Sequence, residues 1–428
     1  MTTFKTLKLW FNELIIKSSF HTEWIHLSKS SSWFLNNGAI HHKSGRFFSI
    51  IGIRFLDHNG NLPCQPFISQ KETGTLGFLI RETKKRKEIL VQAKIEPGNV
   101  NIIQLAPTCQ ATKSNLLRIH GGGNPPFSQI FADKHLQIIK STLQSEQGRR
   151  FFGKQNRNIL ASTLQKLSLP NTHRWLYVDD LLKMLSQDYL VNTDARSVLV
   201  TSPWNKLVNR PVFSRYKDSF SKDLARSYKE DRNTLQVTKM KNDLALLRQK
   251  RSRFQIIPLN KLKDWQITDK DIEPIQKKPF RIGFLKITAK NREVPDWDQP
   301  IIDSYSEGRV DLICGRINGI LHFLFKPVSE PGLYNIAELS PAICIEPGEN
   351  GKTKVLYRGK VMISVKQSDE GGRFYQDVTR YRIIDVGKAD LRLNGYWFNL
   401  AQIQFLLLEN GWFTNESRSV LSLLLYWL

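Results

Sequence analysis

QPFISQKETG (Gln65–Gly74) returns in the second half of the chain as QPIIDSYSEG (Gln299–Gly308). At the same spacing and without a gap, EPGNVNIIQLAP (Glu96–Pro107) returns as EPGLYNIAELSP (Glu330–Pro341). A long ungapped match of this kind indicates that one structural unit has been duplicated within the chain. We therefore expect two homologous halves that share one fold.

Shorter motifs extend the repeat toward the end of each half. QSEQGRRFF (Gln144–Phe152) is matched by QSDEGGRFY (Gln367–Tyr375), and ARSVL (Ala195–Leu199) is matched by SRSVL (Ser417–Leu421). The spacing between matched motifs shortens along the chain, so the second copy has lost residues.

The stretch between the two copies is rich in Lys and Arg. Met240, Leu244 and Leu247 recur there at helical spacing, which predicts an amphipathic helix with a basic outer face. That face could contact nucleic acid or a second subunit, but no aromatic residues cluster beside it, so we favour a solvated surface. The predicted domains are a first repeat over residues 1–205, a basic helical connector over residues 206–253 and a second repeat over residues 254–428.

Each half combines strands with a late helix. Gly45–Leu56, Thr75–Glu82 and Glu88–Ile95 are β-rich runs bounded by turn residues. Asn318-Gly319 predicts a type I′ hairpin in the second half, and the KKRK run of the first half falls at the equivalent tip. Val178 to Leu185 has helical spacing, with acidic residues where the helix dipole favours them. The predicted class is α+β.

The composition points to an anionic partner. Of the 428 residues, 63 are Lys or Arg and 39 are Asp or Glu, giving a formal net charge of +24 at pH 7. The fraction of apolar residues, 40%, is ordinary for a globular protein and excludes a wholly disordered chain. Nucleic acid, an anionic membrane and a phosphorylated small molecule all fit this charge.

Cysteine use and hydropathy suggest a cytoplasmic protein. The four cysteines lie far apart without a CxxC pair, so we expect reduced thiols and no metal site. Met1 to Phe20 lacks the apolar core of a signal peptide. The closing run, Leu421–Leu428, is too short to span a bilayer.

Three polar stretches recur or cluster where packing alone would not require them. Glu96 precedes a Pro97-Gly98 turn, which either aims its carboxylate or is merely stabilised by it. Gln110–Asn115 is a row of small and polar residues suited to hydrogen bonds with a sugar or nucleotide. Gln144–Asn158 combines a carboxylate, arginines and aromatic rings, which suit a phosphate and a base; a salt-bridged strand edge is the alternative.

Together, EPGNVNIIQLAPTCQATKSN, QSEQGRRFFGKQNRN and GRFFSIIGI resemble the motifs of the NDP-hexose 2,3-dehydratases of deoxysugar biosynthesis. The resemblance covers nearly the whole chain. It implies a homodimer of chains, each built from two homologous Nudix-like α/β/α domains. It also implies removal of the C2 hydroxyl of an NDP(dTDP)-4-keto-6-deoxyhexose, which leaves a 3,4-diketo-2,6-dideoxy sugar nucleotide. One pocket in each chain would be catalytic and the other a remnant.

The implied reaction is a β-elimination that needs no cofactor. The C4 ketone acidifies the C3 hydrogen and holds the developing enolate, so the protein supplies a base, an acid and donors for the enolate oxygen. The enzyme would be a carbon–oxygen lyase (hydro-lyase). We expect no cofactor, no metal, no nucleic acid and no membrane among its partners.

The site is assigned to the first repeat. The base is predicted to be Glu146 or Glu96, and the proton donor or enolate stabiliser Lys94 or Lys113. Arg118, Arg150 and Arg157 are predicted to hold the diphosphate. The further predicted binding residues are Gln92, Asn99, Gln110, Thr112, Ser114, Asn115, Gln144, Ser145, Gln147, Gly148 and Phe151.

The second repeat carries ICIEPGE (Ile343–Glu349) in place of the polar row, which predicts weak or lost binding there. If the two halves instead share one pocket, Asp369 and Arg373 would belong to it. Two other functions remain open. A Nudix-type nucleotide-sugar hydrolase would need the G-x5-E-x7-R-E-x2-E-E-x-G box, which is absent. A nucleic-acid-binding protein would show a steep dependence of affinity on salt.

Overall fold

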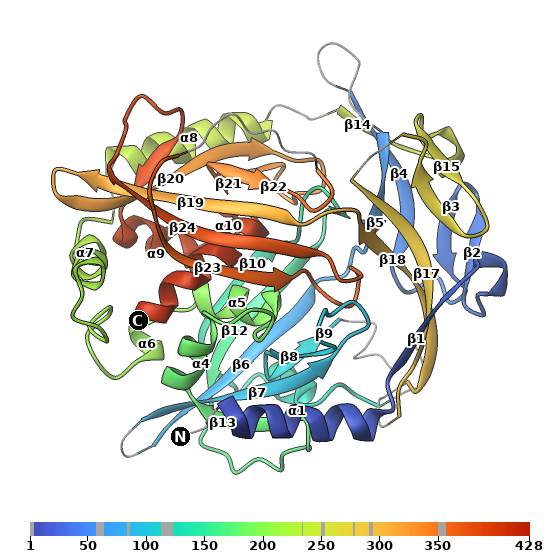
Figure 1. Ribbon diagram of the computed structural model, residues 1–428, viewed down its shortest axis with the longest axis horizontal. Coiled ribbons are helices and arrows are strands. Elements are labelled where there is room, and N and C mark those ends of the chain that lie inside the picture. The colour runs from blue at the N-terminus through green and yellow to red at the C-terminus, as the bar shows by residue number, and fades with distance from the viewer. Residues whose placement is uncertain are drawn as a thin grey trace.

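The computed structural model describes residues 4–56, 64–83, 86–112, 123–232, 234–249, 253–276, 279–290, 294–349 and 357–428. These residues form a mixed α+β structure with four β-sheets (Figure 1). The predicted α+β class is therefore confirmed. The predicted hairpin tip at Lys84 and Lys85 lies outside the described residues.

The two larger sheets have seven strands each. The first runs β10 (Gln137–Ser145), β12 (Gln155–Ser162), β6 (Gly74–Glu82), β7 (Lys87–Ile95) and β13 (His173–Tyr177), with β8 (Ile103–Ala106) on β7 and β9 (Cys109–Ala111) on β6. The second runs β23 (Lys360–Ser368), β24 (Val378–Lys388), β19 (Gly308–Ile317), β20 (Ile320–Ser329) and β25 (Tyr396–Phe398), with β21 (Ala337–Pro341) on β20 and β22 (Ile343–Ile345) on β19.

The pairing of these strands repeats between the two sheets. In each sheet one central pair is parallel, β12 with β6 and β24 with β19, and the neighbouring pairs are antiparallel. The predicted hairpin at Asn318-Gly319 is confirmed, since both residues have positive φ, 50° and 80°, between β19 and β20.

Each of the two smaller sheets includes the first strand of the opposite half of the chain. One contains β11 (Phe151–Phe152), β5 (Cys64–Ser69), β4 (Ser49–Leu56), β3 (Ala39–His42), β2 (Trp33–Asn36) and, from the second half, β14 (Arg253–Ile257). The other contains β15 (Trp265–Ile267), β16 (Asp271–Pro274), β17 (Phe280–Thr288), β18 (Asp296–Ser304) and, from the first half, β1 (His21–Ile25). Because β14 pairs with β4 and β1 with β17, each half completes a sheet of the other.

Two helices join the large sheets. α5 (Thr193–Val200) packs on the first sheet, α10 (Asn415–Ser422) packs on the second, and the two helices pack on each other. Each carries one fully buried arginine of the repeated R-S-V-L motif. Arg196 donates to the carbonyls of Val191 and Leu185 at 3.0 Å, and Arg418 donates to those of Phe413 and Ser145. The motif thus satisfies buried backbone carbonyls beside each helix.

The connector is helical and packs into the core. α7 (Ser219–Tyr228) and α8 (Leu235–Gln249) contribute buried residues, including Met240 and Leu244, to one hydrophobic cluster that also contains residues of both large sheets. The predicted helix around Met240 is confirmed. The remaining helices are α1 (Phe4–Ser18), α3 (Ser128–Ala132), α4 (Val178–Met184), α6 (Trp204–Leu207), α9 (Leu400–Leu407) and the 3₁₀ turns η1 (Leu27–Lys29), η2 (Leu259–Lys261) and η3 (Leu423–Trp427).

The repeated Glu-Pro-Gly turns lock the two halves together. The Gly98 amide donates to the carbonyl of Gly371 at 2.7 Å, and the Gly332 amide donates to that of Gly148 at 2.8 Å. A Cβ on Gly98 would overlap the carbonyl oxygen of Phe374. A Cβ on Gly332 would overlap that of Phe151 in the same way. Glycine is therefore required because two backbones meet there, one from each half.

The loop after each turn ends in a strained residue. Ile102 and Ile336 occupy equivalent positions and both have positive φ, 67° and 69°. A β-branched residue in this region costs roughly 1–3 kcal/mol. Each loop is closed by a backbone hydrogen bond, Glu96 N to Ile102 O at 3.1 Å and Glu330 N to Ile336 O at 3.0 Å.

Replacement of Gly332 by Ala is expected to destabilise the protein. The added methyl has no room beside Phe151 O, and overpacking of this kind costs typically about 1–3 kcal/mol. Thermal unfolding measures the effect. Gly123→Ala is the matched control, since a Cβ there meets nothing within 4 Å. Equal melting temperatures for both variants would contradict this account of the interlocked turns.

Candidate functional site

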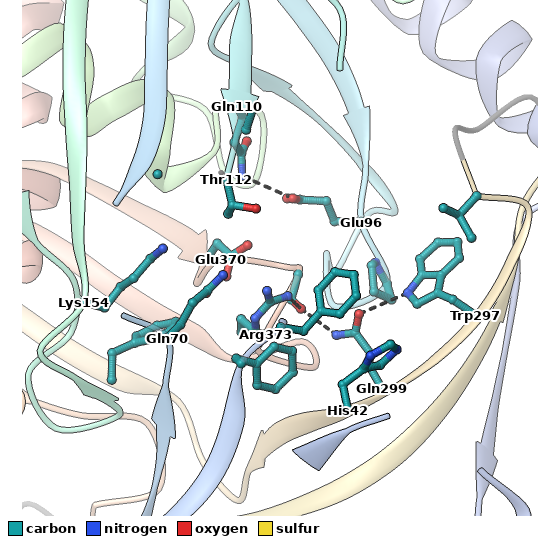
Figure 2. Close-up of a pocket in the computed structure, with 18 of the residues that line it drawn as sticks. His42, Gln70, Glu96, Gln110, Thr112, Lys154, Trp297, Gln299, Glu370 and Arg373 are labelled. Atoms are coloured by element: carbon teal, nitrogen blue, oxygen red, sulfur yellow. Dashed lines mark hydrogen bonds between the residues drawn. The ribbon is translucent and has the colours of Figure 1, made fainter. Parts of the chain in front are cut away.

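A cavity of about 530 Å³ lies where the first large sheet, the β2–β5 sheet and loops of the second half meet. Figure 2 shows its side chains: Glu96, Gln110 and Thr112 lie on one side, Lys154 and Gln70 on another, and Trp297, Gln299 and His42 at the opposite end. Glu370 and Arg373 reach its centre from the loop between β23 and β24. Both halves of the chain therefore build one cavity.

Six acidic residues line the cavity: Glu96, Glu146, Asp194, Asp296, Asp298 and Glu370. Glu96, Glu146, Asp194 and Glu370 form one group whose carboxyls interact electrostatically. Glu96 follows β7 and pairs with Lys94, whose Nζ lies 2.9 Å from its Oε1. Gln110 Nε2 also donates to this carboxylate at 3.4 Å. The Glu-Pro-Gly turn thus aims Glu96 into the cavity, which was one of two interpretations of the motif.

Glu146 lies at the end of β10 and is 7% exposed. Its carboxylate accepts hydrogen bonds from Asn156 Nδ2 and, at 3.1 Å, from Asn415 Nδ2. Burial raises the pKa of Glu146, whereas Arg418, Lys154 and the two amides favour its ionised form. The group is fixed in orientation, as a positioned base must be.

The other two carboxyls have fewer donors. Burial raises the pKa of Glu370 to about 7, against the opposing effect of Arg373. Burial raises the pKa of Asp194 well above its ordinary value, and the carboxylates of Glu146, Glu370 and Glu96 raise it further. Repulsion from the neighbouring carboxylates adds to the effect of burial on the pKa values of both Asp194 and Glu370.

Four cationic residues line the cavity with these acids: Lys43, Lys94, Lys154 and Arg373. Lys94 pairs with Glu96, and Lys154 Nζ donates to the carbonyl of Glu72 at 2.8 Å. Burial lowers the pKa of Lys154, although Glu146 opposes this change. The Arg373 guanidinium lies 4.2 Å from the centroid of the Phe48 ring, and its Nε is buried with no hydrogen-bond partner in the described part of the chain.

Aromatic rings line the end of the cavity that also holds Asp296 and Asp298. Trp33, His42, Phe47, Phe48 and Trp297 belong to it. Trp297 Nε1 donates to Gln299 Oε1 at 3.1 Å, and Gln299 Nε2 donates to Gly372 O at 2.6 Å. The cavity therefore combines a group of buried charged residues with a set of aromatic rings, which suits a ligand with a polar head and a planar ring.

The sequence-predicted site residues divide into three groups. Lys94, Glu96, Gln110, Thr112, Glu146 and Phe151 line the cavity. Gln92, Asn99, Gln144, Ser145, Gln147, Gly148, Arg150 and Arg157 do not line it. Lys113, Ser114, Asn115 and Arg118 lie outside the described residues.

Several cavity residues were missed by sequence reasoning: Lys154, Asn156, Asp194, Glu370, Trp297 and Gln299. The repeat held a signal for Asp194. TDARSVL and NESRSVL both place an acid two residues before the buried arginine, at Asp194 and Glu416. The other idea from sequence, a pocket shared by both halves, correctly includes Arg373, whereas Asp369 does not line the cavity.

The second repeat places a different cluster at the equivalent position. Cys344, Glu346 and Glu416 have potential ligand atoms within 4.8 Å of one another. Arg149 fills this region, with Nε 3.0 Å from Glu330 Oε1 and NH1 2.8 Å from Glu349 Oε1. The guanidinium supplies there the positive charge that a metal ion would bring.

Arg150 also lies beside this second cluster. Its guanidinium lies 4.3 Å from the Phe280 ring centroid and donates to Pro347 O at 3.4 Å. It occupies the position in the second cluster that Arg373 occupies in the cavity, above Phe48. One loop of each half therefore enters the site of the other half.

Two further expectations concern the reduced state of the cysteines and the presence of membrane-spanning segments. All four cysteines are free; three are buried and Cys344 is half-buried. Among the described residues, no helix is both long and apolar enough to cross a membrane.

A cavity that combines buried carboxyls with a buried lysine is typical of enzymes that move protons. Comparison with known proteins agrees with this class. The family model of NDP-hexose 2,3-dehydratase matches residues 4–201 and 244–424. The chain belongs to the NDP-hexose 2,3-dehydratase family.

Three relatives share the name dTDP-4-dehydro-6-deoxy-alpha-D-glucopyranose 2,3-dehydratase. The protein from Saccharopolyspora spinosa is 30% identical over 96% of this chain and 89% of its own length. The Amycolatopsis orientalis protein is 29% identical over 97% and 89%, respectively. The Streptomyces violaceoruber protein is 31% identical over 88% and 86%.

Protein stability is expected to fall as pH rises from about 4.5 to about 7. Burial raises the pKa values of Glu330, Glu346 and Glu416 from 4.5 to about 7. Between these values the folded protein binds more protons than the unfolded chain, so the free energy of unfolding decreases with pH. Each pKa unit corresponds to about 1.4 kcal/mol.

Calorimetry at pH 6 and pH 8 tests this expectation. The melting temperature should be a few degrees higher at pH 6, and Glu416→Gln should reduce the difference. A melting temperature that rises between pH 6 and pH 8 would contradict the assignment of neutral acids to the second cluster.

Proposed function

We propose that this protein is a hydro-lyase that removes the C2 hydroxyl of a dTDP-4-keto-6-deoxyhexose and yields the 3,4-diketo-2,6-dideoxy sugar nucleotide. The observation that carries the proposal is one cavity whose lining combines a group of four buried carboxyls and two lysines with several aromatic rings. Family membership supports the same reaction, and the names of the three relatives support a dTDP-linked substrate.

The reaction requires a base, an acid and a donor to the enolate oxygen, and residues of the cavity are candidates for each of these roles. A base removes the C3 proton, and the electrons move toward the C4 ketone. The C2–oxygen bond then breaks, and an acid protonates the departing hydroxide to give water. The resulting enol becomes the 3-ketone when C2 gains a proton and the C3 hydroxyl loses one. Each acid or base contributes typically about 10²–10⁴-fold to the rate.

Glu146 is our choice as base. Two asparagine amides hold its carboxylate in place, and Arg418 and Lys154 favour its ionised form. Glu96 is less suited, because Lys94 already pairs with it at 2.9 Å. Lys154 is a candidate donor to the enolate oxygen, a role that Lys94 shares, and Lys113 stays a sequence prediction outside the described residues.

The aromatic end suits the thymine ring, and Arg373 suits the diphosphate. A guanidinium matches phosphate oxygens in geometry as well as charge. The buried Arg373 Nε has no partner in the described residues, so a phosphate oxygen would satisfy it. Gln110, Thr112 and Phe151 are placed to contact the sugar or phosphate groups.

The architecture that we infer is a duplication of one Nudix-like α/β/α domain. The supporting observation is the common strand pairing of the two large sheets. The proposed repeats span residues 1–205 and 254–428, joined by the basic helical connector at 206–253. We further propose a cytoplasmic homodimer that binds neither nucleic acid nor membrane and uses no cofactor.

Incubation with dTDP-4-keto-6-deoxyglucose tests the reaction. Mass spectrometry is expected to show loss of one water from the nucleotide sugar. Glu146→Gln should lower kcat by about 10²–10⁴-fold, because the amide cannot take the C3 proton, while dTDP binding persists.

Asp369→Asn is the matched control for this variant, since Asp369 is the equivalent of Glu146 in the second repeat and does not line the cavity. Its turnover should stay within a few-fold of wild type. Full turnover by Glu146→Gln would contradict the assignment of the base, and no water loss by the wild-type protein would contradict the reaction.

Arg373→Met is expected to weaken dTDP binding. A hydrogen bond to a charged group is worth about 1.5–3 kcal/mol, so the Kd should rise roughly tenfold to a hundredfold. Isothermal titration calorimetry measures it. Arg157→Met removes an exposed arginine outside the cavity and should leave the Kd nearly unchanged. The reverse ranking would support the diphosphate position predicted from sequence.

A further inference from the structure

Asp194 lies in the first turn of α5 and lines the cavity, although its side chain is largely buried, 4% exposed. The helix start is already capped by another residue. Asn192 Oδ1 accepts from Ala195 N at 2.8 Å, and Asn192 O accepts from Arg196 N at 3.2 Å. The helix therefore leaves the Asp194 carboxyl free to face the ligand space.

The four interacting carboxyls differ in what surrounds them. Glu146 accepts from two amides, and Glu96 has an ammonium and an amide. Within the described residues, no hydrogen bond or ion pair reaches the carboxyl of Glu370 or of Asp194, but Arg373 favours the ionised form of Glu370.

Charged groups from several elements face Asp194. Glu96 on the β7 turn, Glu146 after β10 and Glu370 on the β23–β24 loop all oppose its ionisation. Lys94 on β7 and Arg418 on α10 act in the opposite direction. Burial is the largest effect and raises the pKa of Asp194 together with the three acids. Of the four carboxyls, Asp194 is the one whose surroundings best keep it protonated at neutral pH.

We propose that Asp194 is the catalytic acid that protonates the departing C2 hydroxyl. This assignment rests on the proposed function, and it completes the pair begun by Glu146: one cavity holds a carboxyl with several hydrogen-bond donors as base and a carboxyl without such donors as acid. Environments that separate two carboxyl groups in this way assign them opposite roles.

The proton transfers balance. Glu146 takes the C3 proton, the C2–oxygen bond breaks, and the oxygen leaves as water with the proton of Asp194. The product at this stage is an enol with its hydroxyl on C3. That hydroxyl returns a proton to the Asp194 carboxylate while Glu146 delivers a proton to C2. Both carboxyls end in their starting states, and the substrate has lost one water.

Reactions in D2O distinguish a catalytic acid from a residue that is only structural. In D2O, Asp194→Asn should lose about 10²–10⁴-fold in kcat for dehydration, yet it should still exchange the C3 hydrogen of the intact substrate for deuterium, because Glu146 remains. Glu146→Gln should do neither. NMR of the recovered substrate and mass spectrometry of the product report the two steps.

Glu416→Gln is the matched control, because Glu416 is the equivalent acid in the second repeat and does not line the cavity. It should keep turnover within a few-fold of wild type. Asn matches the shape of a neutral Asp, so Asp194→Asn should also keep its melting temperature.

The results for Asp194→Asn show whether Asp194 acts as the acid or in another role. Retained C3 exchange without water loss supports Asp194 as acid. Dehydration by Asp194→Asn within about threefold of wild type overturns the proposal. Loss of both exchange and dehydration in this variant also overturns it, since the residue would then act before the leaving step. Failure of the wild-type protein to release water would count against the proposed function instead.

The pH dependence gives a second test on the unmodified enzyme. If a neutral acid is required, kcat should fall above the pKa of Asp194, and this alkaline decline should be absent from the residual rate of Asp194→Asn. The same alkaline decline in both proteins would overturn the proposal.

Discussion

The contact between the two Glu-Pro-Gly turns and the glycine loops of the opposite half determines the rest of the structure. The Gly98 amide donates to the Gly371 carbonyl at 2.7 Å, and the Gly332 amide donates to the Gly148 carbonyl at 2.8 Å. The two halves therefore contact each other through their backbones. Such close approach brings the neighbouring side chains of each loop into the other half. Glu370 and Arg373 enter the cavity, and Arg149 and Arg150 enter the second cluster by the same route.

Burying many carboxyls in one region is unfavourable unless each has a partner or a proton. The cavity uses both means. Asn156 and Asn415 hold Glu146 and Lys94 pairs with Glu96, whereas Asp194 has no such partner among the described residues and its surroundings favour the protonated form. The proposed β-elimination beside a ketone requires this difference between a base and an acid.

The sequence predicted the elements better than the site. Periodicity and turn residues were sufficient for the hairpin at Asn318-Gly319 and for the helix around Met240, because these depend on local chemistry. Glu96 and Glu146 could also be found, since polar residues in repeated motifs are informative. Glu370 could not be placed with them, because the exchange of loops between halves is a long-range property. Arg150 was assigned to the pocket of Glu146, but Arg149 and Arg150 both face the second cluster, whereas Glu146 and Phe151 on either side of them line the cavity.

One difference between the repeats places a side chain in the second cluster where the first site has none. QSEQGRRFF has Arg149 where QSDEGGRFY has Gly372. In the second cluster the Arg149 side chain occupies the space between Glu330 and Glu349, with contacts of 3.0 and 2.8 Å. At the equivalent place in the first site Gly372 has no side chain, and the cavity of about 530 Å³ extends past it. The duplicated fold thus carries two geometrically related sites: a guanidinium lies between the acids of the second, whereas a glycine lines the cavity of the first.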